Sequence, residues 1–384
     1  MTTFLLLVAA ASLVFLTEFG IEMFLGNRST THLKNVPPCS QSPQPRVSIV
    51  IPARNEERNI REALQSILLQ DYPNLEFIVM NDRSTDKTGA ILAEMVSHDA
   101  RLRVIEIQEL PPGWIGKNYA LFRGAQSATG ELLLFADADV VMDPTAVTRA
   151  VYYLQQRQLQ HLAVLPEIRM PGALLGIFTT AFGIFFSLYA RPWKAKNPKS
   201  KRFIGIGAFN LVSAGAYRAA GTHQAIAMRP DDDIKLGKLL KKHGCRQELV
   251  FGAGMMHVEW YASVGEMIDG LMKNSFSGVG YSIVAATASG LALLLSTVWP
   301  FVAAVATHGA TQILNILIVA VLLAIGADSN RFHNLPRWYA LGLPLGGLLF
   351  TYIVWRAMLT TLWNGGIRWR GTYYPLRRLK SNKV

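Results

Sequence analysis

A run of 47 residues, 281–327, contains no Asp, Glu, Lys or Arg. As one helix it would be about 70 Å long, more than twice the ~30 Å hydrocarbon core of a bilayer. We therefore expect two helices that join near His308 and Gly309. Residues 46–160, in contrast, have the charge density of an ordinary water-soluble domain. The chain is therefore expected to combine membrane segments with one large globular domain.

Another apolar stretch lies at the N-terminus. Residues 3–25 carry only two charged side chains, Glu18 and Glu22, which lie four apart on one helical face. A signal peptide would carry Lys or Arg before its apolar stretch, and none is present here. Arg28 and Lys34 instead follow the stretch. The charge bias predicts an uncleaved anchor with its N-terminus outside and the next domain in the cytoplasm. The two glutamates should lie near the cytoplasmic end, facing protein or headgroups.

The net charge of +12 is unevenly placed. Many cations directly follow apolar segments, in residues 191–202 and 368–383, which suits an anionic membrane surface. No aromatic-basic RNA motif or zinc finger accompanies the charge, so nucleic acid is not an expected partner. Cys39 and Cys245 exclude a disulfide framework, and neither has a His or Cys neighbour at zinc-binding spacing. Two free thiols in a reducing compartment are expected.

From residue 46 onward the sequence alternates between strand and helix patterns. Residues 47–51 form a continuous apolar run with β-branched side chains, typical of a strand buried on both faces. Residues 56–70 carry apolar side chains at helical spacing. Alternation of this kind predicts an α/β fold with a mainly parallel sheet. Further strands are expected at 76–80, 103–107 and 131–135, and further helices near 86–98, 117–128 and 144–158.

Polar residues follow the first two predicted strands. The first strand ends in a turn, Pro52-Ala53-Arg54-Asn55-Glu56, that can cradle a nucleotide with backbone amides and a helix N-terminus. A plain Pro break before a capped helix would give the same pattern. Asp82 follows the second strand and is suited to hold a base or a ribose. Asp86 has two interpretations, a functional side chain or the N-cap of the next helix.

Asp137 and Asp139 follow the strand at 131–135. Two carboxylates at i and i+2 after a strand can take separate roles, one toward a ribose and one toward Mg²⁺ or Mn²⁺. Such a metal would bridge two phosphates and neutralise the charge on a departing diphosphate. Because carboxylates placed after parallel strands converge on one sheet edge, Asp82 is expected in the same site.

In these motifs the chain resembles glycosyltransferase family 2, whose members have the GT-A fold. The resemblance covers about residues 46–280 and is greatest to bacterial membrane members similar to carotenoid- and hopanoid-associated glycosyltransferases. Ceramide glucosyltransferases are more distant, and the tail 367–371 also looks like that of these relatives. The motifs that carry the resemblance are Val50-Ile51-Pro52-Ala53-Arg54-Asn55-Glu56, Asn81-Asp82-Arg83-Ser84-Thr85-Asp86, Gly113-Trp114-Ile115-Gly116-Lys117, Asp137-Ala138-Asp139 and Asp232-Asp233-Ile234-Lys235-Leu236.

The resemblance implies a role for each matching residue. The residues implied for the nucleotide sugar are Pro52, Arg54, Glu56, Asp82, Lys117 and Asp137, and those implied for the metal are Asp139 and Asp137. Lys117 would touch the diphosphate, which suits its positive charge. Asp137 would approach either the ribose or the metal. Mg²⁺ or Mn²⁺ is therefore the expected cofactor.

Asp231, Asp232 and Asp233 open a further predicted helix. The family's Glu-Asp-x-x-Leu pattern aligns on residues 232–236, so the resemblance implies that Asp233 is the general base, with Asp232 beside it. Neighbouring carboxylates should raise the pKa of this base toward a useful range. The alternative is a helix start enriched in acids that the helix dipole favours.

One family motif is missing, and the acceptor side is less defined. Processive and sphingolipid-type members carry Gln/Arg-x-x-Arg-Trp where residues 271–276 read Leu-Met-Lys-Asn-Ser-Phe, which argues against a polymerase and weakens the ceramide comparison. Gly207 and Ala208 are acceptor candidates because glycine permits close approach, although a Gly-rich core connection is equally consistent. Trp260 and Tyr261 would stack on sugar or acceptor, or belong to a membrane-interface belt.

These features together predict an inverting, metal-dependent glycosyltransferase. It would move a sugar from a nucleoside diphosphate sugar, expected to be a UDP-sugar, to a hydroxyl or carboxyl of a membrane lipid at the cytoplasmic face. One alternative is a polyprenyl-phosphate glycosyltransferase, whose acceptor is already ionised and needs no base. Another is a non-enzymatic transporter or scaffold, although the apolar segments after residue 280 hold only Arg356 as an obvious charge. The sequence does not determine the sugar, the lipid or the oligomeric state.

A further uncharged stretch, residues 173–190, is long enough to cross a membrane. A full crossing would separate Asp137 and Asp139 from Asp233, so an interfacial position is expected instead, with the cations of 191–202 on headgroups. The expected organisation is a transmembrane anchor (1–26), a linker (27–45), a GT-A domain (46–280) with an interfacial segment (173–202), transmembrane helices (281–364) and a basic tail (365–384).

The topology of the C-terminal segments contains a conflict. Crossings by 282–304, 310–327 and 338–362 would leave the tail outside, whereas its cations place it in the cytoplasm by the positive-inside rule. Segment 338–362 has the weakest spanning pattern, because Pro344 and nearby glycines interrupt it and Arg356 lies inside it. We expect a cytoplasmic tail that packs near the globular domain. The protein is thus expected to be a multi-pass cell-membrane protein with a cytoplasmic catalytic domain.

Overall fold

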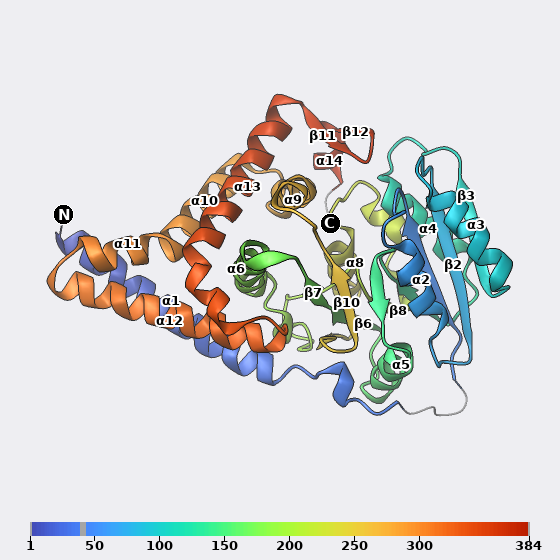
Figure 1. The fold of residues 1–384 in the computed structure, drawn as a ribbon, viewed down its shortest axis with the longest axis horizontal. Coiled ribbons are helices and arrows are strands. Elements are labelled where there is room, and N and C mark those ends of the chain that lie inside the picture. Colours follow the sequence, from blue (N-terminus) through green and yellow to red (C-terminus); the bar gives the residue numbers. More distant parts are fainter. Residues whose placement is uncertain (1, 39–43, 383–384) are drawn as a thin grey trace. The chain divides into compact units, whose positions relative to one another are not determined.

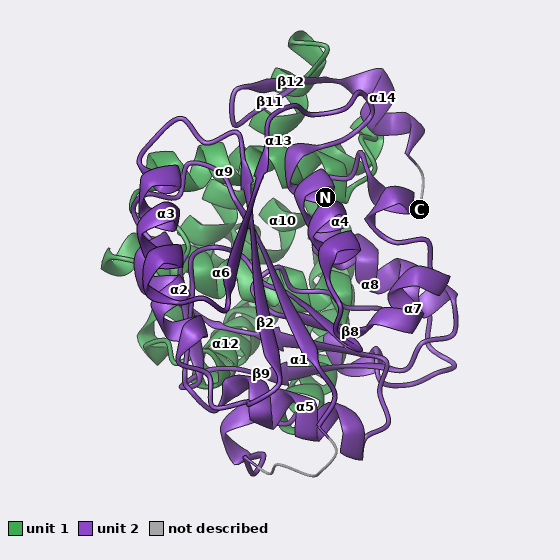
Figure 2. Ribbon diagram, turned by 90° about the vertical axis from the view of Figure 1, so that its right-hand side faces the viewer, with its two compact units in different colours: residues 1–29, 170–191, 260–366 green, residues 30–169, 192–259, 367–384 purple. Residues whose placement is uncertain are grey.

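The computed structural model describes residues 2–38 and 44–382, and its elements are labelled in Figure 1. The chain forms two compact units, each assembled from three stretches of sequence (Figure 2). Unit 1 comprises residues 1–29, 170–191 and 260–366, and unit 2 comprises residues 30–169, 192–259 and 367–384. Part of the predicted linker, together with Cys39, lies outside the described residues.

Unit 2 is built on a seven-stranded sheet with the strand order β3-β2-β1-β4-β8-β6-β9. Within this sheet β8 runs antiparallel to both of its neighbours, and the other pairs are parallel. The prediction of a mainly parallel sheet is therefore confirmed. The strands are β1 (Val47–Ala53), β2 (Leu75–Asp82), β3 (Leu102–Ile107), β4 (Leu132–Phe135), β6 (His161–Leu165), β8 (Asn210–Ser213) and β9 (Gln247–Phe251).

Helices cover both faces of this sheet, so its strands are buried on both sides. Along β1, Ile49 and Ile51 join the core formed with α2, whereas Val50 joins the core formed with α4 and α8. The predicted helices are present, with the largest shift at α2, where residues 56–59 form a turn before the helix begins. The helices of unit 2 are α2 (Ile60–Leu68), α3 (Thr88–His98), α4 (Gly116–Ser127), α5 (Ala146–Gln156), α7 (Ala214–Ala219), α8 (Asp232–Lys242) and α14 (Leu376–Ser381).

The remaining strands form two smaller sheets. The first has the order β5-β10-β7 and consists of β5 (Val140–Met142), β10 (Met256–Glu259) and β7 (Glu167–Arg169). The second is a hairpin of β11 (Gly366–Trp369) and β12 (Thr372–Pro375). Ile367, Tyr374 and Leu379 are buried, and residues 367–384 cluster with unit 2. The tail therefore packs with the globular domain, as expected from the sequence.

Unit 1 is helical. Among the described residues, four helices are long and apolar enough to cross a membrane, over Thr3–Arg28, Gly172–Lys194, Gly309–Phe332 and Arg337–Trp363. A further pair, α9 and α10, meets the same criteria only jointly and is bent by 118°. The helices are α1 (Thr2–Arg28), α6 (Gly172–Ala190), α9 (Val264–Gly278), α10 (Ile283–Thr297), α11 (Trp299–Ala306), α12 (Gly309–Phe332) and α13 (Leu343–Trp363).

The uncharged run divides at the predicted place and at one more. α12 begins at Gly309, so the predicted junction is confirmed. The helix expected over 282–304 is itself broken between α10 and α11, close to Pro300. Proline lacks the N–H that would continue the hydrogen-bond ladder, which accounts for a break at this position.

Within unit 1, α1 and α12 lie side by side (Figure 1). Arg28, at the end of α1, makes two hydrogen bonds of 2.8 and 2.9 Å to Asp328, near the end of α12. The two helices therefore run in the same direction. Glu22 forms an ion pair of 3.0 Å with Arg191, so this glutamate faces protein, one of the two environments predicted for it.

Candidate functional site

The carboxyl ends of β1, β2 and β4 meet at one edge of the large sheet. β1 is hydrogen-bonded to β2 on one side and to β4 on the other, with Ala53 beside Asn81 and Val50 beside Phe135. The polar turns that follow these three strands therefore begin at the same edge. This register places the segments predicted to bind a nucleotide next to the Asp-Ala-Asp motif, as expected for a parallel sheet.

Asp82 lies at the end of β2 and is only 3% exposed. Its carboxylate is 2.7 Å from Arg83 Nε and 3.5 Å from Arg54 Nη1, so two guanidinium groups neutralise it. A side chain at Gly116, the first residue of α4, would collide with this carboxylate. Glycine is thus required where α4 approaches β2. Pro52 is part of β1 and is partly buried at the same edge.

Asp86 has the contacts of a capping residue. Its carboxylate accepts the backbone N–H of Thr88, the first residue of α3, at 3.0 Å, and that of Glu57 at 3.1 Å. Asn55, with a φ of 55°, accepts the N–H of Thr85 at 2.8 Å. These bonds join the turn after β1 to the turn after β2, which favours the capping interpretation of Asp86.

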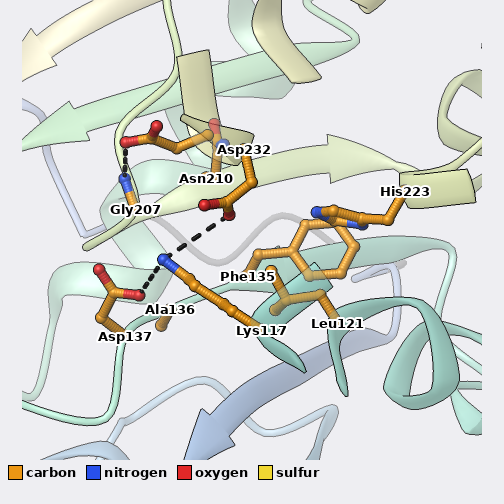
Figure 3. A pocket seen from close by; sticks show the side chains of 10 residues that line it. Lys117, Leu121, Phe135, Ala136, Asp137, Gly207, Asn210, His223 and Asp232 are labelled. Carbon is orange, nitrogen blue, oxygen red and sulfur yellow. Dashed lines mark hydrogen bonds and ion pairs between the residues drawn. The ribbon is translucent and has the colours of Figure 1, made fainter. Parts of the chain in front are cut away.

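Lys117 connects two of the predicted acidic motifs (Figure 3). Its Nζ lies 2.7 Å from Asp137 Oδ1 and 3.6 Å from Asp232 Oδ2. Burial alone would lower the pKa of Lys117, but the negative charges of Asp137 and Asp232 raise it above its ordinary value. The lysine is therefore a fixed positive charge among carboxylates, and it is suited to meet a diphosphate.

Asp139 provides an unused oxygen. Its Oδ1 is buried and has no hydrogen-bond partner among the described residues. Burial, with the charges of Asp137 and Glu56, raises the pKa of Asp139 to about 7. Within the described part of the chain no group of three or more His, Cys, Asp and Glu side chains is arranged to hold a metal. The carboxylate oxygens of Asp139 and Asp137 are of the kind that a divalent cation such as Mg²⁺ prefers.

The three acids at the start of α8 have different surroundings. Asp231 pairs with Arg229 at 2.9 Å and with Lys235 at 3.3 Å, so its contacts are structural. Asp232 is 4% exposed and faces Lys117 (Figure 3). Asp233 Oδ2 accepts the backbone N–H of Gly207 at 2.9 Å.

Both interpretations of this acidic run therefore apply, since the acids stand in the first turn of α8 and also border the site. Burial raises the pKa of Asp233, and Asp137 adds to this effect, whereas the charge of Lys117 opposes it. A raised pKa makes a carboxylate a stronger proton acceptor, which suits a general base.

Lys117, Asp137 and Asp232 line a pocket (Figure 3). His223 and Asn210 line it too, although the sequence did not single them out. His223 Nδ1 is 2.8 Å from the Tyr217 hydroxyl, and the ring packs edge-on against Phe135. Burial, together with the charge of Lys117, lowers the pKa of His223 to about 3. No motif surrounds this histidine, so only the folded chain reveals that it lies beside the carboxylates.

The predicted acceptor residues divide between the two units. Gly207 and Ala208 belong to unit 2, where a Cβ at Gly207 would come within 2.6 Å of Asp137 Oδ2. Trp260 and Tyr261 belong to unit 1 and stack with their ring centroids 5.0 Å apart. Trp260 also packs edge-on against Phe182 of α6. The acceptor role of these four residues stays a prediction.

Known proteins are similar to this chain. The sequence model described as Glycosyl transferase family 2 matches residues 48–213. The 4,4'-diaponeurosporenoate glycosyltransferase of Staphylococcus haemolyticus is 27% identical over 238 residues, which are 59% of this chain and 60% of that protein. The probable glycosyltransferase YdaM of Bacillus subtilis is 34% identical over 145 residues, 37% of this chain and 32% of that protein. The chain thus spans about three-fifths of the first relative and a third of the second.

A solved structure shares the fold. The mannosyltransferase PcManGT from Pyrobaculum calidifontis, in complex with GDP-Man and Mn²⁺, superposes with a TM-score of 0.55. The match covers 94% of this chain and 99% of that protein at 18% identity. The matched family region contains β1, β2, β4 and the polar turns at their ends. Residues 48–213 of this chain therefore match glycosyl transferase family 2, and they lie within a GT-A fold.

Proposed function

We propose that the protein is an inverting, metal-dependent glycosyltransferase that moves a sugar from a nucleoside diphosphate sugar to a membrane lipid. The observation that carries the proposal is the convergence of Asp82, Lys117, Asp137, Asp139 and Asp233 at one sheet edge. Acidic residues for a metal and a base, beside a lysine for a diphosphate, are the groups that such a transfer uses. The match of residues 48–213 to the glycosyl transferase family 2 model supports the reaction class.

The donor would lie along this edge. Arg54, Glu56 and Asp82, with Pro52, surround the nucleoside, and Lys117 contacts the diphosphate. Asp139 and Asp137 hold a divalent ion, Mg²⁺ or Mn²⁺, which supplies positive charge to the departing diphosphate when bound. We propose UDP as the nucleoside diphosphate. GDP-mannose is the second donor to test because the solved mannosyltransferase contains it together with Mn²⁺.

Asp233 acts as the general base for a hydroxyl acceptor. The acceptor O–H proton moves to the carboxylate, the oxygen attacks the anomeric carbon, and the bond from that carbon to the diphosphate oxygen breaks. One displacement inverts the configuration and needs no covalent intermediate. The raised pKa of Asp233 supports this role, because the carboxylate then takes up a proton more readily.

The acceptor is proposed to be a lipid with a hydroxyl or a carboxyl group. The names of the staphylococcal relatives contain a carotenoid acid, which supports a lipid acceptor with a carboxyl group. A carboxylate or a polyprenyl phosphate is already ionised near neutral pH, so neither would need a base. The effect of removing Asp233 therefore separates a hydroxyl acceptor from these two ionised acceptors.

The proposal includes a cell-membrane location with unit 2 in the cytoplasm. α6 connects two stretches of unit 2, residues 30–169 and 192–259, so both of its ends lie on one side of the membrane. It is therefore an interfacial helix, although it is long enough to span. Residues 260–366 also start and end at unit 2, which requires an even number of crossings.

The direction of α12 supports one assignment of the crossings. α1 and α12 run the same way, as the Arg28–Asp328 pair indicates, so both enter the cytoplasm at their C-terminal ends. α10 and α11 together then lead outward, and α13 remains on the cytoplasmic side. Under this topology segment 338–362 does not cross, and the positive-inside rule holds for the tail.

The test is a transfer assay with the full-length protein in detergent. UDP-glucose, UDP-galactose, UDP-N-acetylglucosamine and GDP-mannose are each supplied with Mn²⁺ and a bacterial lipid extract, and glycolipids are detected by mass spectrometry. We expect one donor to give a new glycolipid whose anomeric configuration is opposite to that of the donor. A product that keeps the anomeric configuration of the donor would contradict the proposal. So would the absence of a glycolipid product with every donor, whether the lipid extract comes from cells with the protein or from cells without it.

A further inference from the structure

The C-terminal hairpin has an unusual turn. Arg370 and Gly371 connect β11 to β12, and both have positive φ angles, 47° and 78°. Two-residue hairpin turns of this kind favour Asn, Asp or Gly at the first position, because a larger side chain is strained there. An arginine at this position is therefore unfavourable for the backbone. Its side-chain contacts provide a reason.

Arg370 holds the turn that follows β1. Its Nη1 donates to the backbone carbonyl of Arg54, and its Nη2 lies 2.5 Å from Glu56 Oε1. Arg54 and Glu56 are the residues proposed to surround the nucleoside. A paired guanidinium that contacts both a carboxylate and a carbonyl fixes the orientation of this turn.

Tyr374 holds the start of α4. Its side chain is 5% exposed, and its hydroxyl accepts the backbone N–H of Gly116 at 3.2 Å. The first N–H groups of a helix have no partner within the helix, and Ile115 at the N-cap supplies no side-chain acceptor. The tyrosine therefore caps α4 one residue before Lys117, the residue proposed to meet the diphosphate.

The end of the tail holds a third segment. Asn382 accepts the N–H of Met228 at 3.0 Å and donates to the carbonyl of Ala225 at 3.0 Å. From the other side, the amide of Asn118 on α4 donates to carbonyls of the same loop, at Ile226 and Arg229. This loop leads directly into the acids at the start of α8.

We propose that residues 370–382 form a clasp that positions the donor-binding segments of unit 2 relative to one another. Arg370 and Tyr374 are positioning residues, since they act through Glu56 and Gly116 rather than on the sugar itself. The clasp lies more than 150 residues beyond the matched family region, 48–213, and it completes the donor site from the far end of the chain. This inference rests on the proposed donor site.

The first measurement does not require a ligand. Hydrogen–deuterium exchange of the full-length protein in detergent is compared between the wild type, Tyr374→Phe and the matched control Tyr373→Phe, in which the exposed neighbouring tyrosine loses its hydroxyl. Loss of one hydrogen bond should accelerate exchange at Gly116 and Lys117 about three- to tenfold. Tyr373→Phe should leave exchange there unchanged. Unchanged exchange in Tyr374→Phe would overturn the clasp.

The second measurement uses UDP and GDP with Mn²⁺ as probes in calorimetry. Arg370→Gln should weaken binding of the preferred nucleotide about tenfold, and Tyr374→Phe about fivefold, with melting temperatures close to that of the wild type. Arg368→Gln, an equal charge change at an exposed residue of the same hairpin, should bind like the wild type. Arg370→Lys keeps the charge opposite Glu56 and should recover part of the affinity.

In turnover assays with the identified donor, Arg370→Gln and Tyr374→Phe should raise the donor KM more than they lower kcat. Wild-type affinity in both variants would overturn the clasp while leaving the proposed function intact. A wild-type protein that binds neither probe would count against the proposed function instead, and the exchange measurement would then decide the clasp by itself.

Discussion

The Nζ atom of Lys117 lies 2.7 Å from Oδ1 of Asp137, although the two residues come from different motifs. The lysine stands in the first turn of α4, and the aspartate follows β4. This contact brings the positive charge proposed for the diphosphate into the acidic part of the site.

Lys117→Met should lower both stability and activity. Removal of one partner of a buried ion pair costs up to about 3–5 kcal/mol, and this lysine is 22% exposed, so a smaller loss is expected. Calorimetric melting should show the decrease, and transfer should fall by about 100-fold or more because the diphosphate loses its charge partner. Lys87→Met, at an exposed position, is the matched control. Normal transfer by Lys117→Met would refute the diphosphate role.

Asp139→Asn should abolish transfer and leave the fold intact. The buried, unpartnered Oδ1 of Asp139 is the proposed metal ligand, and an amide is a much weaker ligand than a carboxylate. Electron paramagnetic resonance of Mn²⁺ in the presence of UDP measures the expected loss of metal binding directly. Full activity of the native protein in EDTA would eliminate the metal assignment.

Asp233→Asn separates the acceptor classes. With a hydroxyl acceptor, turnover should fall by about 10²–10⁴-fold while nucleotide-sugar binding persists. With a carboxylate or phosphate acceptor the loss should be mild, because the nucleophile is already ionised. Steady-state assays of Asp233→Asn and Asp232→Asn are compared for this purpose. A severe defect in Asp232→Asn beside a near-normal Asp233→Asn would shift the base by one residue.

The burial of His223 should make the stability of the folded protein depend on pH. Because burial lowers the pKa of His223 to about 3, the folded protein binds fewer protons at this residue than the unfolded chain, whose histidine titrates near 6.5. The stabilising contribution is complete above about pH 6.5 and is lost as the pH falls toward 3, by up to about 1.4 kcal/mol per pH unit. Melting temperatures from pH 7.5 to 4 should show this fall, and His223→Gln should reduce its slope, while His161, whose pKa burial lowers to about 4, should account for part of the slope that remains. An equal slope in the variant would assign the effect to other groups.

The topology predicts which residues an impermeant thiol reagent reaches in intact cells. In a background without Cys39 and Cys245, a cysteine at the exposed position His308 should react from outside. Under the proposed topology, in which α13 does not cross, cysteines at Arg337 and Ser381, also exposed, should react only after permeabilisation. Reaction at Ser381 but not at Arg337 in intact cells would mean that α13 spans the membrane.

The sequence predicted much of the fold because the relevant signals are local. Apolar runs of strand length, helical spacing and turn residues are read within a few positions. The strands β1, β2 and β4 formed where expected, and among their helices only α2 begins clearly later than predicted. The break near Pro300 was missed in a segment that reads as uniformly apolar. The sheet-edge site was also predictable, since parallel strands bring the residues after their carboxyl ends together.

Other parts of the site were decided only by tertiary contacts. Nothing near His223 marks it in the sequence, and its burial beside Lys117 depends on how β8 and the loop before α8 pack. Tyr374 reaches the Gly116 amide across 258 residues of chain. Local patterns determined which segments become strands, helices and turns. Side-chain burial and hydrogen bonds between distant segments determined the partners of each polar group, because these depend on positions that only the folded chain defines.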